Sequence, residues 1–205
     1  MKIKKKFLVL GHPRSGTGFM SALFNKFGYN VGHETMGKDG ISSWMFAVDD
    51  NQVYGEIGLT RKDFEFDYVI MNIRDPISIV SSTFYTENTA TPSLEYRKKH
   101  INLSHVQNEI DLSVKSVLGW YSIIEKQNPD IVIKVDELPE QSLCSFLNLA
   151  AELEHSVCPD AVVQRNINGR KHETLSHTDL IQACNKQTVQ EFENFCNRYG
   201  YYDYR

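Results

Sequence analysis

The fold is decided by a stretch near the N-terminus, Phe7-Leu8-Val9-Leu10-Gly11-His12-Pro13-Arg14-Ser15-Gly16-Thr17-Gly18-Phe19-Met20. It opens with a continuous apolar run, which is typical of a strand buried on both faces of a parallel sheet. The apolar residues after the loop recur at helical spacing as far as Phe27, and Gly28 supplies a C-terminal stop. The stretch therefore predicts a strand, a glycine-containing loop and a helix, in that order.

The loop Gly11-x-x-x-x-Gly16 has the spacing of a P-loop, in which backbone N–H groups and the start of a helix surround an anion. The lysine that follows the second glycine in nucleotide hydrolases and kinases is missing, since Thr17 and Gly18 stand there. A cation, Arg14, lies inside the loop instead. The loop is thus expected to hold a phosphate or sulfonate without the usual triphosphate–metal apparatus; a turn that is glycine-rich for geometry alone is the alternative.

The rest of the chain alternates strand and helix patterns. Strands are expected at 29–31, 66–73 and 131–135, and helices at 76–85, 104–126, 139–149 and from Ser176 to about 195 or 199. Residues 87–102 and 159–175 are expected to be polar loops, and 39–46 a turn into a short helix. This order predicts an α/β fold with a central, mainly parallel sheet in a three-layer sandwich, and 205 residues fit one domain, 1–205.

Two sequence motifs resemble those of a known family. Pro13-Arg14-Ser15-Gly16-Thr17 resembles the 5′-phosphosulfate-binding loop of sulfotransferases that use 3′-phosphoadenosine 5′-phosphosulfate (PAPS), whose motif is Pro-Lys/Arg-x-Gly-Thr after the first strand. Arg74 at a strand end and Ser82 eight residues later resemble that family's 3′-phosphate site. Residues 132–138 resemble, less closely, a strand that ends in Tyr-Glu-Asp-Leu. The resemblance covers about residues 7–150 and implies a P-loop NTPase-like sulfotransferase fold.

The resemblance implies PAPS as co-substrate and 3′-phosphoadenosine 5′-phosphate as product. The donor-binding residues that it implies are Pro13, Arg14, Ser15, Gly16, Thr17, Gly18, Phe19, Arg74 and Ser82. The C-terminal Arg-Lys-Gly element of cytosolic members has no clean counterpart. Arg170 and Lys171, in the polar segment 168–172, are candidates to replace it, with a solvated basic turn as the alternative.

Sulfonyl transfer needs a base for the acceptor and cations for the leaving phosphate. In several branches of the family the base is a Glu just past the helix that follows the phosphate loop, a position that Glu34 matches. Glu34 is therefore the first candidate for the base and His33 the second, a hydrogen-bonded loop pair being the alternative. Arg14 is the candidate for stabilising the leaving group, and no metal is expected. Trp44 and Phe46 could wall the acceptor pocket, although core packing is favoured.

Composition limits the other function classes. The chain is 41% hydrophobic with a formal net charge of −4, which gives no general electrostatic case for nucleic acid or an anionic membrane as partner. The apolar runs are too short for a membrane span, so a soluble, cytoplasmic protein is expected. Reduced cysteines are favoured, with one or two disulfides as the alternative. The expected partner is a small-molecule or carbohydrate acceptor. A P-loop kinase of a small metabolite and a non-catalytic nucleotide-binding module are the alternatives.

Overall fold

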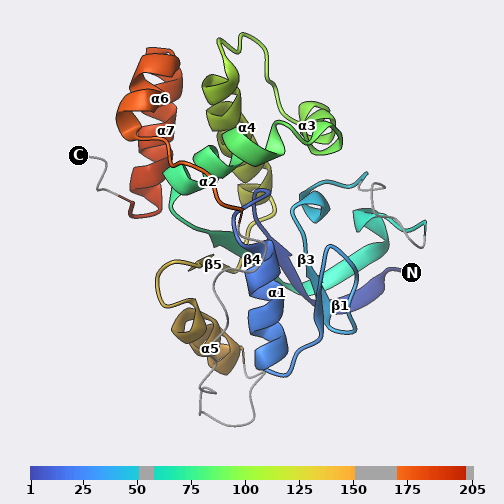
Figure 1. Cartoon of the computed structure of the whole chain (residues 1–205). Helices are drawn as coiled ribbons and strands as arrows, with labels where there is room; N and C mark the ends of the chain where they lie inside the picture. The colour runs from blue at the N-terminus through green and yellow to red at the C-terminus, as the bar shows by residue number, and fades with distance from the viewer. Residues whose placement is uncertain (51–57, 151–169, 202–205) are drawn as a thin grey trace. The chain divides into compact units, whose positions relative to one another are not determined.

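The computed structural model describes residues 1–50, 58–150 and 170–201 (Figure 1). Its strands are β1 (Ile3–Leu10), β2 (Val31–His33), β3 (Gly40–Ser42), β4 (Phe64–Ile73) and β5 (Ile131–Lys134). Its α-helices are α1 (Thr17–Lys26), α2 (Pro76–Ser82), α3 (Thr91–Lys98), α4 (Glu109–Glu125), α5 (Pro139–Leu149), α6 (His177–Ala183) and α7 (Lys186–Arg198). Short 3₁₀ turns cover Met45–Ala47 and Arg61–Asp63, and a π-helical turn covers Thr83–Glu87 directly after α2.

The centre of the sheet is β1. The five strands lie in the order β2-β3-β1-β4-β5, and every strand pair is parallel. Leu8 of β1 lies opposite Ile41 on one side and Val69 on the other, and residues 7–10 have no exposed surface. Burial on both faces and pairing at both edges explain the continuous apolar run. The predicted α/β fold with a central parallel sheet is confirmed.

Helices α1 and α5 pack against one face of this sheet (Figure 1). Because side chains alternate along a strand, Phe7 and Val9 point to the same face, and both belong to one buried cluster. The helices contribute Phe19, Met20, Leu23, Phe24, Leu143 and Leu147 to it. Complete burial of a side chain of this size contributes about 2 kcal/mol. This cluster therefore holds the helix that follows the loop against the strand that precedes it.

Packing divides the chain into two compact units. The first unit comprises Met1–Gly11, Ser15–Ile73 and Ile124–Gly169, and it contains the sheet with α1 and α5. The second unit comprises His12–Arg14, Arg74–Ile123 and Arg170–Arg205, and it contains α2, α3, α6, α7 and most of α4. The expectation of a single domain over residues 1–205 stays a prediction. Within the described ranges, no helix is both long and apolar enough to cross a membrane.

The stretch 87–102 is not the loop that its polarity predicts, because it contains α3. Pro92 lies in the first turn of α3, where proline is well tolerated. Tyr96 is 4% exposed and Arg97 is completely buried. Packing of these two side chains stabilises a helix that hydrophobic periodicity does not signal.

The C-terminal helix expected from Ser176 is two helices. Ser176 and Asp179 form the expected capping box of α6, but this helix ends at Ala183. Asn185 then caps α7, since its side chain accepts a hydrogen bond from the N–H of Thr188. Asparagine is a favoured cap because its side-chain oxygen accepts a hydrogen bond from an N–H of the first turn that has no partner within the helix.

Three smaller boundaries also differ from expectation. The strand expected at 29–31 begins at Val31, the helix expected from 104 begins at Glu109, and β3 was not expected. β3 has three residues, too few for a period-two pattern to be recognised. In the segment after β3, Phe46 is 8% exposed and lies 6.0 Å from Phe64 between ring centroids. Phe46 therefore packs in the core, which was the favoured reading.

The favoured expectation of reduced cysteines is wrong for Cys144. Cys144 is disulfide-bonded, whereas Cys184 and Cys196 are buried thiols. Burial, followed by the neighbouring Asp111, raises the pKa of the Cys184 thiol to about 12. Wide spacing along the sequence carried no signal for the disulfide, because pairing depends on how the chain folds.

Replacing Gly40 by Ala is expected to lower the free energy of unfolding by about 3 kcal/mol. The added methyl group would overlap the carbonyl oxygen of Phe7 on the neighbouring central strand. Gly28→Ala is the control, because its φ of 86° disfavours alanine while no atom lies within 4 Å of the added carbon. It is expected to cost about 1 kcal/mol. Urea unfolding measures both; an equal or larger loss in Gly28→Ala would contradict the prediction.

Candidate functional site

The loop between β1 and α1 lies at the carboxyl end of the central strand. The strand order changes direction at β1, with β2 and β3 on one side and β4 and β5 on the other. In open α/β sheets, ligands bind outside the carboxyl ends of the strands at such a point. Gly16 caps α1 with a φ of 102°, a conformation that glycine adopts readily, and as a glycine it has no side chain to cap the helix. The first N–H groups of α1 are thus suited to an anion.

In the first unit, both strands beside β1 fix the loop. The side-chain N–H of Asn72 on β4 donates to the carbonyl oxygen of Ser15 at 2.9 Å and to its hydroxyl at 3.0 Å. On the other side, the hydroxyl of Ser42 on β3 donates to the carbonyl oxygen of Thr17 at 2.7 Å. All four residues are buried. The second half of the loop is therefore held by buried hydrogen bonds from two strands.

The first unit also brings together both candidate bases. Glu34 follows β2 with a φ of 58°, and its Oε2 accepts a hydrogen bond from the hydroxyl of Ser43 at 2.7 Å. The Nε2 atom of His33 lies 3.6 Å from Oε1 of Glu34 and 3.3 Å from Oγ1 of Thr17. Burial lowers the pKa of His33, so its imidazole is neutral at pH 7. The imidazole of His33 thus lies between the hydroxyl of Thr17 and the carboxylate of Glu34, and that carboxylate is bonded to Ser43.

In the second unit, the side chain of Arg14 contacts the last residue of α2. Its backbone has a φ of 74°, which is uncommon for a residue with a side chain. Its Nε donates to the hydroxyl of Ser82 at 3.2 Å and lies 3.9 Å from Oε1 of Glu87. Burial lowers the pKa of Arg14, Glu87 opposes this shift, and the positive charge of Arg170 adds to it. Arg14 therefore has a carboxylate and a second guanidinium as electrostatic neighbours.

Arg74 and Ser82 have separate described contacts. One terminal nitrogen of Arg74 donates to the carbonyl oxygen of Ser78 at 3.0 Å, within the first turn of α2. Asp75 caps that helix, because its side chain accepts a hydrogen bond from the N–H of Ser78. The hydroxyl of Ser82, which is 1% exposed, accepts from Arg14. Ser82 was expected to bind a phosphate together with Arg74. Its described partner is instead Arg14 of the loop.

The segment that carries Arg170 and Lys171 is fastened to α2 and to the π-helical turn. The N–H of Leu175 donates to the hydroxyl of Ser81 at 2.9 Å. The ring of His172 stacks on Tyr85 with 5.5 Å between centroids, and Glu173 is hydrogen-bonded to Tyr85. Arg170 and Lys171 are exposed. These contacts fasten the residues that follow Arg170 and Lys171; residues 168 and 169 of the expected element lie outside the described residues.

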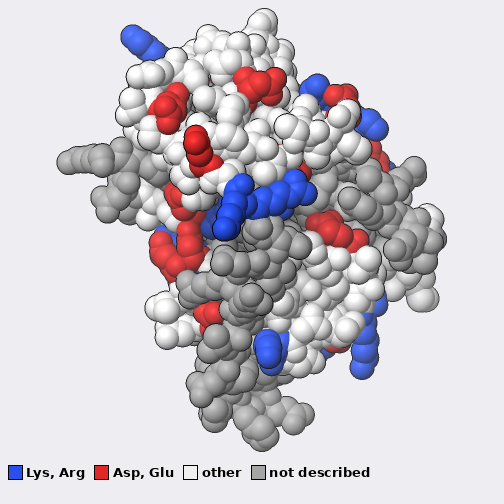
Figure 2. Space-filling view, viewed as in Figure 1, with Lys and Arg blue, Asp and Glu red and all other residues white. Residues whose placement is uncertain are grey.

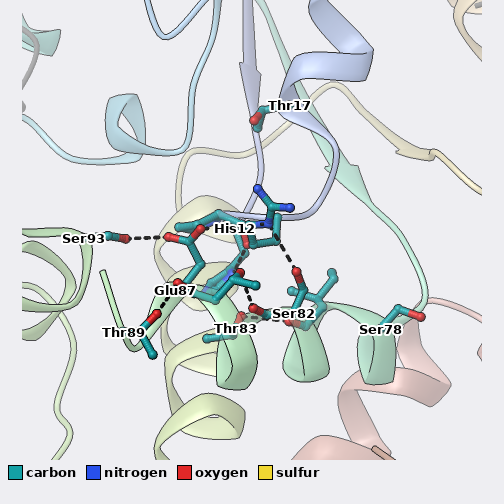
Figure 3. Close-up of polar contacts among 12 residues, drawn as sticks. His12, Thr17, Ser78, Ser82, Thr83, Glu87, Thr89 and Ser93 are labelled. Carbon is teal, nitrogen blue, oxygen red and sulfur yellow. Dashed lines mark hydrogen bonds and ion pairs between the residues drawn. The ribbon is translucent and has the colours of Figure 1, made fainter. Parts of the chain in front are cut away.

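The structure differs from the sequence-based expectation at Glu87 and Phe19. Glu87, which sequence reasoning missed, closes the π-helical turn, and its Oε2 accepts a hydrogen bond from Ser93 at 3.0 Å (Figure 3). No spacing rule signals it, because a π turn is not visible in the sequence. Phe19, expected at the donor site, has its side chain in the apolar core at 5% exposure. The backbone of Phe19, rather than its side chain, is the part suited to contact a ligand.

One face of the described surface has mixed charge. On the face drawn in Figure 2, Lys and Arg side chains lie among Asp and Glu side chains. Within the described ranges, no group of three or more His, Cys, Asp or Glu residues could hold a metal ion. No protein-family model, curated protein or solved structure matches this chain.

The variant Glu87→Gln is expected to bind inorganic pyrophosphate about fivefold more tightly than the wild type, because a carboxylate beside Arg14 repels an incoming anion. The amide keeps the size of the side chain and can still accept from Ser93. Glu95→Gln is the control, since Glu95 lies on α3, is 57% exposed and pairs with Lys98. Isothermal titration calorimetry measures both. Weaker binding by Glu87→Gln would contradict the electrostatic assignment.

Proposed function

We propose that the chain is a PAPS-dependent sulfotransferase, which transfers a sulfonyl group to a hydroxyl or amine of a small-molecule or carbohydrate acceptor. The observation that carries the proposal is the hydrogen bond from Arg14 to Ser82, 68 residues apart in sequence. It joins one residue from each of the two motifs that resemble this family. A chance likeness of two short motifs gives no reason for their residues to be in contact.

The donor is assigned to residues of matching chemistry. The 5′-phosphosulfate is assigned to Arg14 and the backbone N–H groups of residues 15–18, because successive amides at a helix start bind anions. The 3′-phosphate is assigned to Arg74 and Ser82, with Arg170 and Lys171 as further cations. The electrostatic effect of Arg170 on Arg14 supports including Arg170. The loop lacks the lysine that a kinase uses for the β- and γ-phosphates of ATP, so the proposal favours PAPS over ATP.

In the proposed step, the acceptor oxygen attacks the sulfur atom in line with the bridging oxygen of the donor. The new S–O bond forms as the bridging S–O bond breaks, and the 5′-phosphate leaves with the electron pair. Arg14 stabilises the charge that develops on this leaving group. Glu34 accepts the proton of the acceptor, and the hydrogen bond from Ser43 supports its orientation. The step as written uses no metal ion.

The surroundings of His33 also suit a general base. Its Nε2 faces both Thr17 and Glu34, and its lowered pKa keeps it neutral near pH 7. A neutral imidazole can accept a proton, so His33 is the alternative base. Because His33 adjoins Glu34, only a comparison of the two single variants separates the two assignments.

The donor assignment is tested by isothermal titration calorimetry with 3′-phosphoadenosine 5′-phosphate. Micromolar binding without magnesium is expected, with no binding of ATP under the same conditions. Arg74→Ala is expected to weaken binding of 3′-phosphoadenosine 5′-phosphate by roughly tenfold or more, since hydrogen bonds to charged groups contribute about 1.5–3 kcal/mol. Arg198→Ala, at the end of α7, is the control. Magnesium-dependent ATP binding in place of this pattern would favour a kinase, and unchanged binding by Arg74→Ala would overturn the 3′-phosphate assignment.

The base assignment is tested by the rate of sulfonyl transfer at saturating PAPS. Glu34→Gln is expected to lower kcat by about 100-fold or more at unchanged donor affinity, because the amide cannot take the proton. His33→Ala is expected to have a smaller effect. If His33→Ala has the larger effect, the two roles are exchanged. If neither variant slows transfer, the base lies elsewhere in the chain.

A further inference from the structure

A buried polar chain of contacts in the second unit ends on the backbone of the loop. It begins at Arg97, which has no exposed surface although it carries a charge. A terminal nitrogen of Arg97 donates to the hydroxyl of Ser116 on α4. The same hydroxyl lies 3.0 Å from Nε2 of His12, and Nδ1 of His12 lies 2.7 Å from the carbonyl oxygen of Pro13. His12 and Ser116 are also completely buried.

These contacts determine where the protons lie. Arg97 can only donate, so the hydroxyl of Ser116 accepts from Arg97 and gives its own hydrogen to Nε2 of His12. The carbonyl oxygen of Pro13 can only accept, so Nδ1 of His12 carries the hydrogen that it donates there. Burial, followed by the charge of Arg97, lowers the pKa of His12 well below its usual value. His12 is therefore a neutral imidazole with its proton on Nδ1.

The tautomer of His12 has a consequence for the loop. The Pro13–Arg14 peptide is trans, so its N–H and its carbonyl oxygen point in opposite directions. The oxygen is held toward the buried imidazole, and the N–H of Arg14 is therefore directed away from it. Arg14 keeps this backbone orientation at a φ of 74°, which is unfavourable for a residue with a side chain and needs such a restraint.

Arg97 is also connected to the turn that contacts the Arg14 side chain. Its Nε donates to the carbonyl oxygen of Ser93 at 3.3 Å, and its other terminal nitrogen to that of Glu87 at 3.5 Å. Burial lowers the pKa of Arg97 to about 10, so the guanidinium remains charged at neutral pH. Its donors thus reach α3, α4 and the π-helical turn, all elements of the second unit.

We propose that Arg97, acting through Ser116 and His12, is the positioning residue of the anion-binding loop, because it fixes the Pro13–Arg14 peptide with the N–H of Arg14 turned toward the ligand. The inference rests on the proposed function in one respect, that the loop binds an anion. It assigns roles to three buried residues that sulfonyl transfer itself does not use.

The first measurement is the tautomer of His12 in the ligand-free wild-type protein, from the ¹⁵N and ¹³C chemical shifts of its ring. The His12→Phe variant, which keeps the ring volume, identifies the signals. A neutral ring with the proton on Nδ1 is expected. A proton on Nε2, or a doubly protonated ring at pH 7, would overturn the inference whatever the ligand is.

The second measurement compares Ser116→Ala with Ser113→Ala. Both serines lie completely buried on α4, but the hydroxyl of Ser113 contacts Glu109 and Asn88. Both variants are expected to lower Tm similarly. Only Ser116→Ala is expected to weaken anion binding, by about tenfold, the effect of one buried hydrogen bond. Affinities for 3′-phosphoadenosine 5′-phosphate and for inorganic pyrophosphate are measured by calorimetry. An equal loss in Ser113→Ala, or no loss in Ser116→Ala, would overturn the inference.

The two probes separate this inference from the proposed function. If the wild type binds pyrophosphate but not 3′-phosphoadenosine 5′-phosphate, the sulfotransferase proposal fails, and a tenfold loss of pyrophosphate affinity in Ser116→Ala still supports the inference. If the wild type binds neither probe, both fail. If it binds both, and only Ser116→Ala is weakened, both are supported.

Discussion

The rest of the structure depends on the burial of β1 as a central parallel strand. Its residues 7–10 have no exposed surface, and both of its edges are paired, with β3 and with β4. Since the next strands run in the same direction, the chain must leave β1 at its carboxyl end and return through a helix. The loop 11–16 therefore lies at the carboxyl edge of the sheet, directly before α1. The position of the candidate anion-binding loop follows from how the sheet is built.

The predictable elements are those whose buried residues form an apolar pattern in the sequence. β1, β4 and α1 carry apolar runs or helical spacing because the second half of each strand and most of α1 are buried. β4 was expected at 66–73 and spans Phe64–Ile73, whereas β1 begins at Ile3, four residues before the apolar run that predicted it. β3 and α3 could not be predicted in this way. β3 is a three-residue strand whose Gly40 lies against the backbone of Phe7. α3 buries Arg97, and arginine in a sequence indicates a solvated face unless its partners are known. Tertiary contacts decide both elements.

The sequence predicted which residues belong to the candidate site, but it did not predict which of them contact one another. The loop pattern identified Arg14, and a spacing of eight residues identified Arg74 and Ser82. The described partner of Ser82 is nevertheless Arg14, and after Ser82 the chain continues into a π-helical turn that has an extra residue per turn. The same turn brings Glu87 to Arg14. Sequence spacing assumes regular helices, so it cannot predict contacts that depend on an irregular one.

The buried guanidinium of Arg97 is difficult to explain by stability alone. Removing a charge from water costs several kcal/mol, and a well-packed apolar side chain is often at least as stabilising at such a position. What an apolar side chain could not do is orient a hydroxyl, and through it an imidazole, toward one backbone oxygen. The backbone of Arg14 is oriented by this chain of contacts, whereas its guanidinium is held by Ser82 and Glu87. Two separate sets of polar contacts therefore control the amide and the charge of the same residue. They meet at Glu87, which accepts from Arg97 at its carbonyl oxygen and forms an ion pair with Arg14 through its carboxylate.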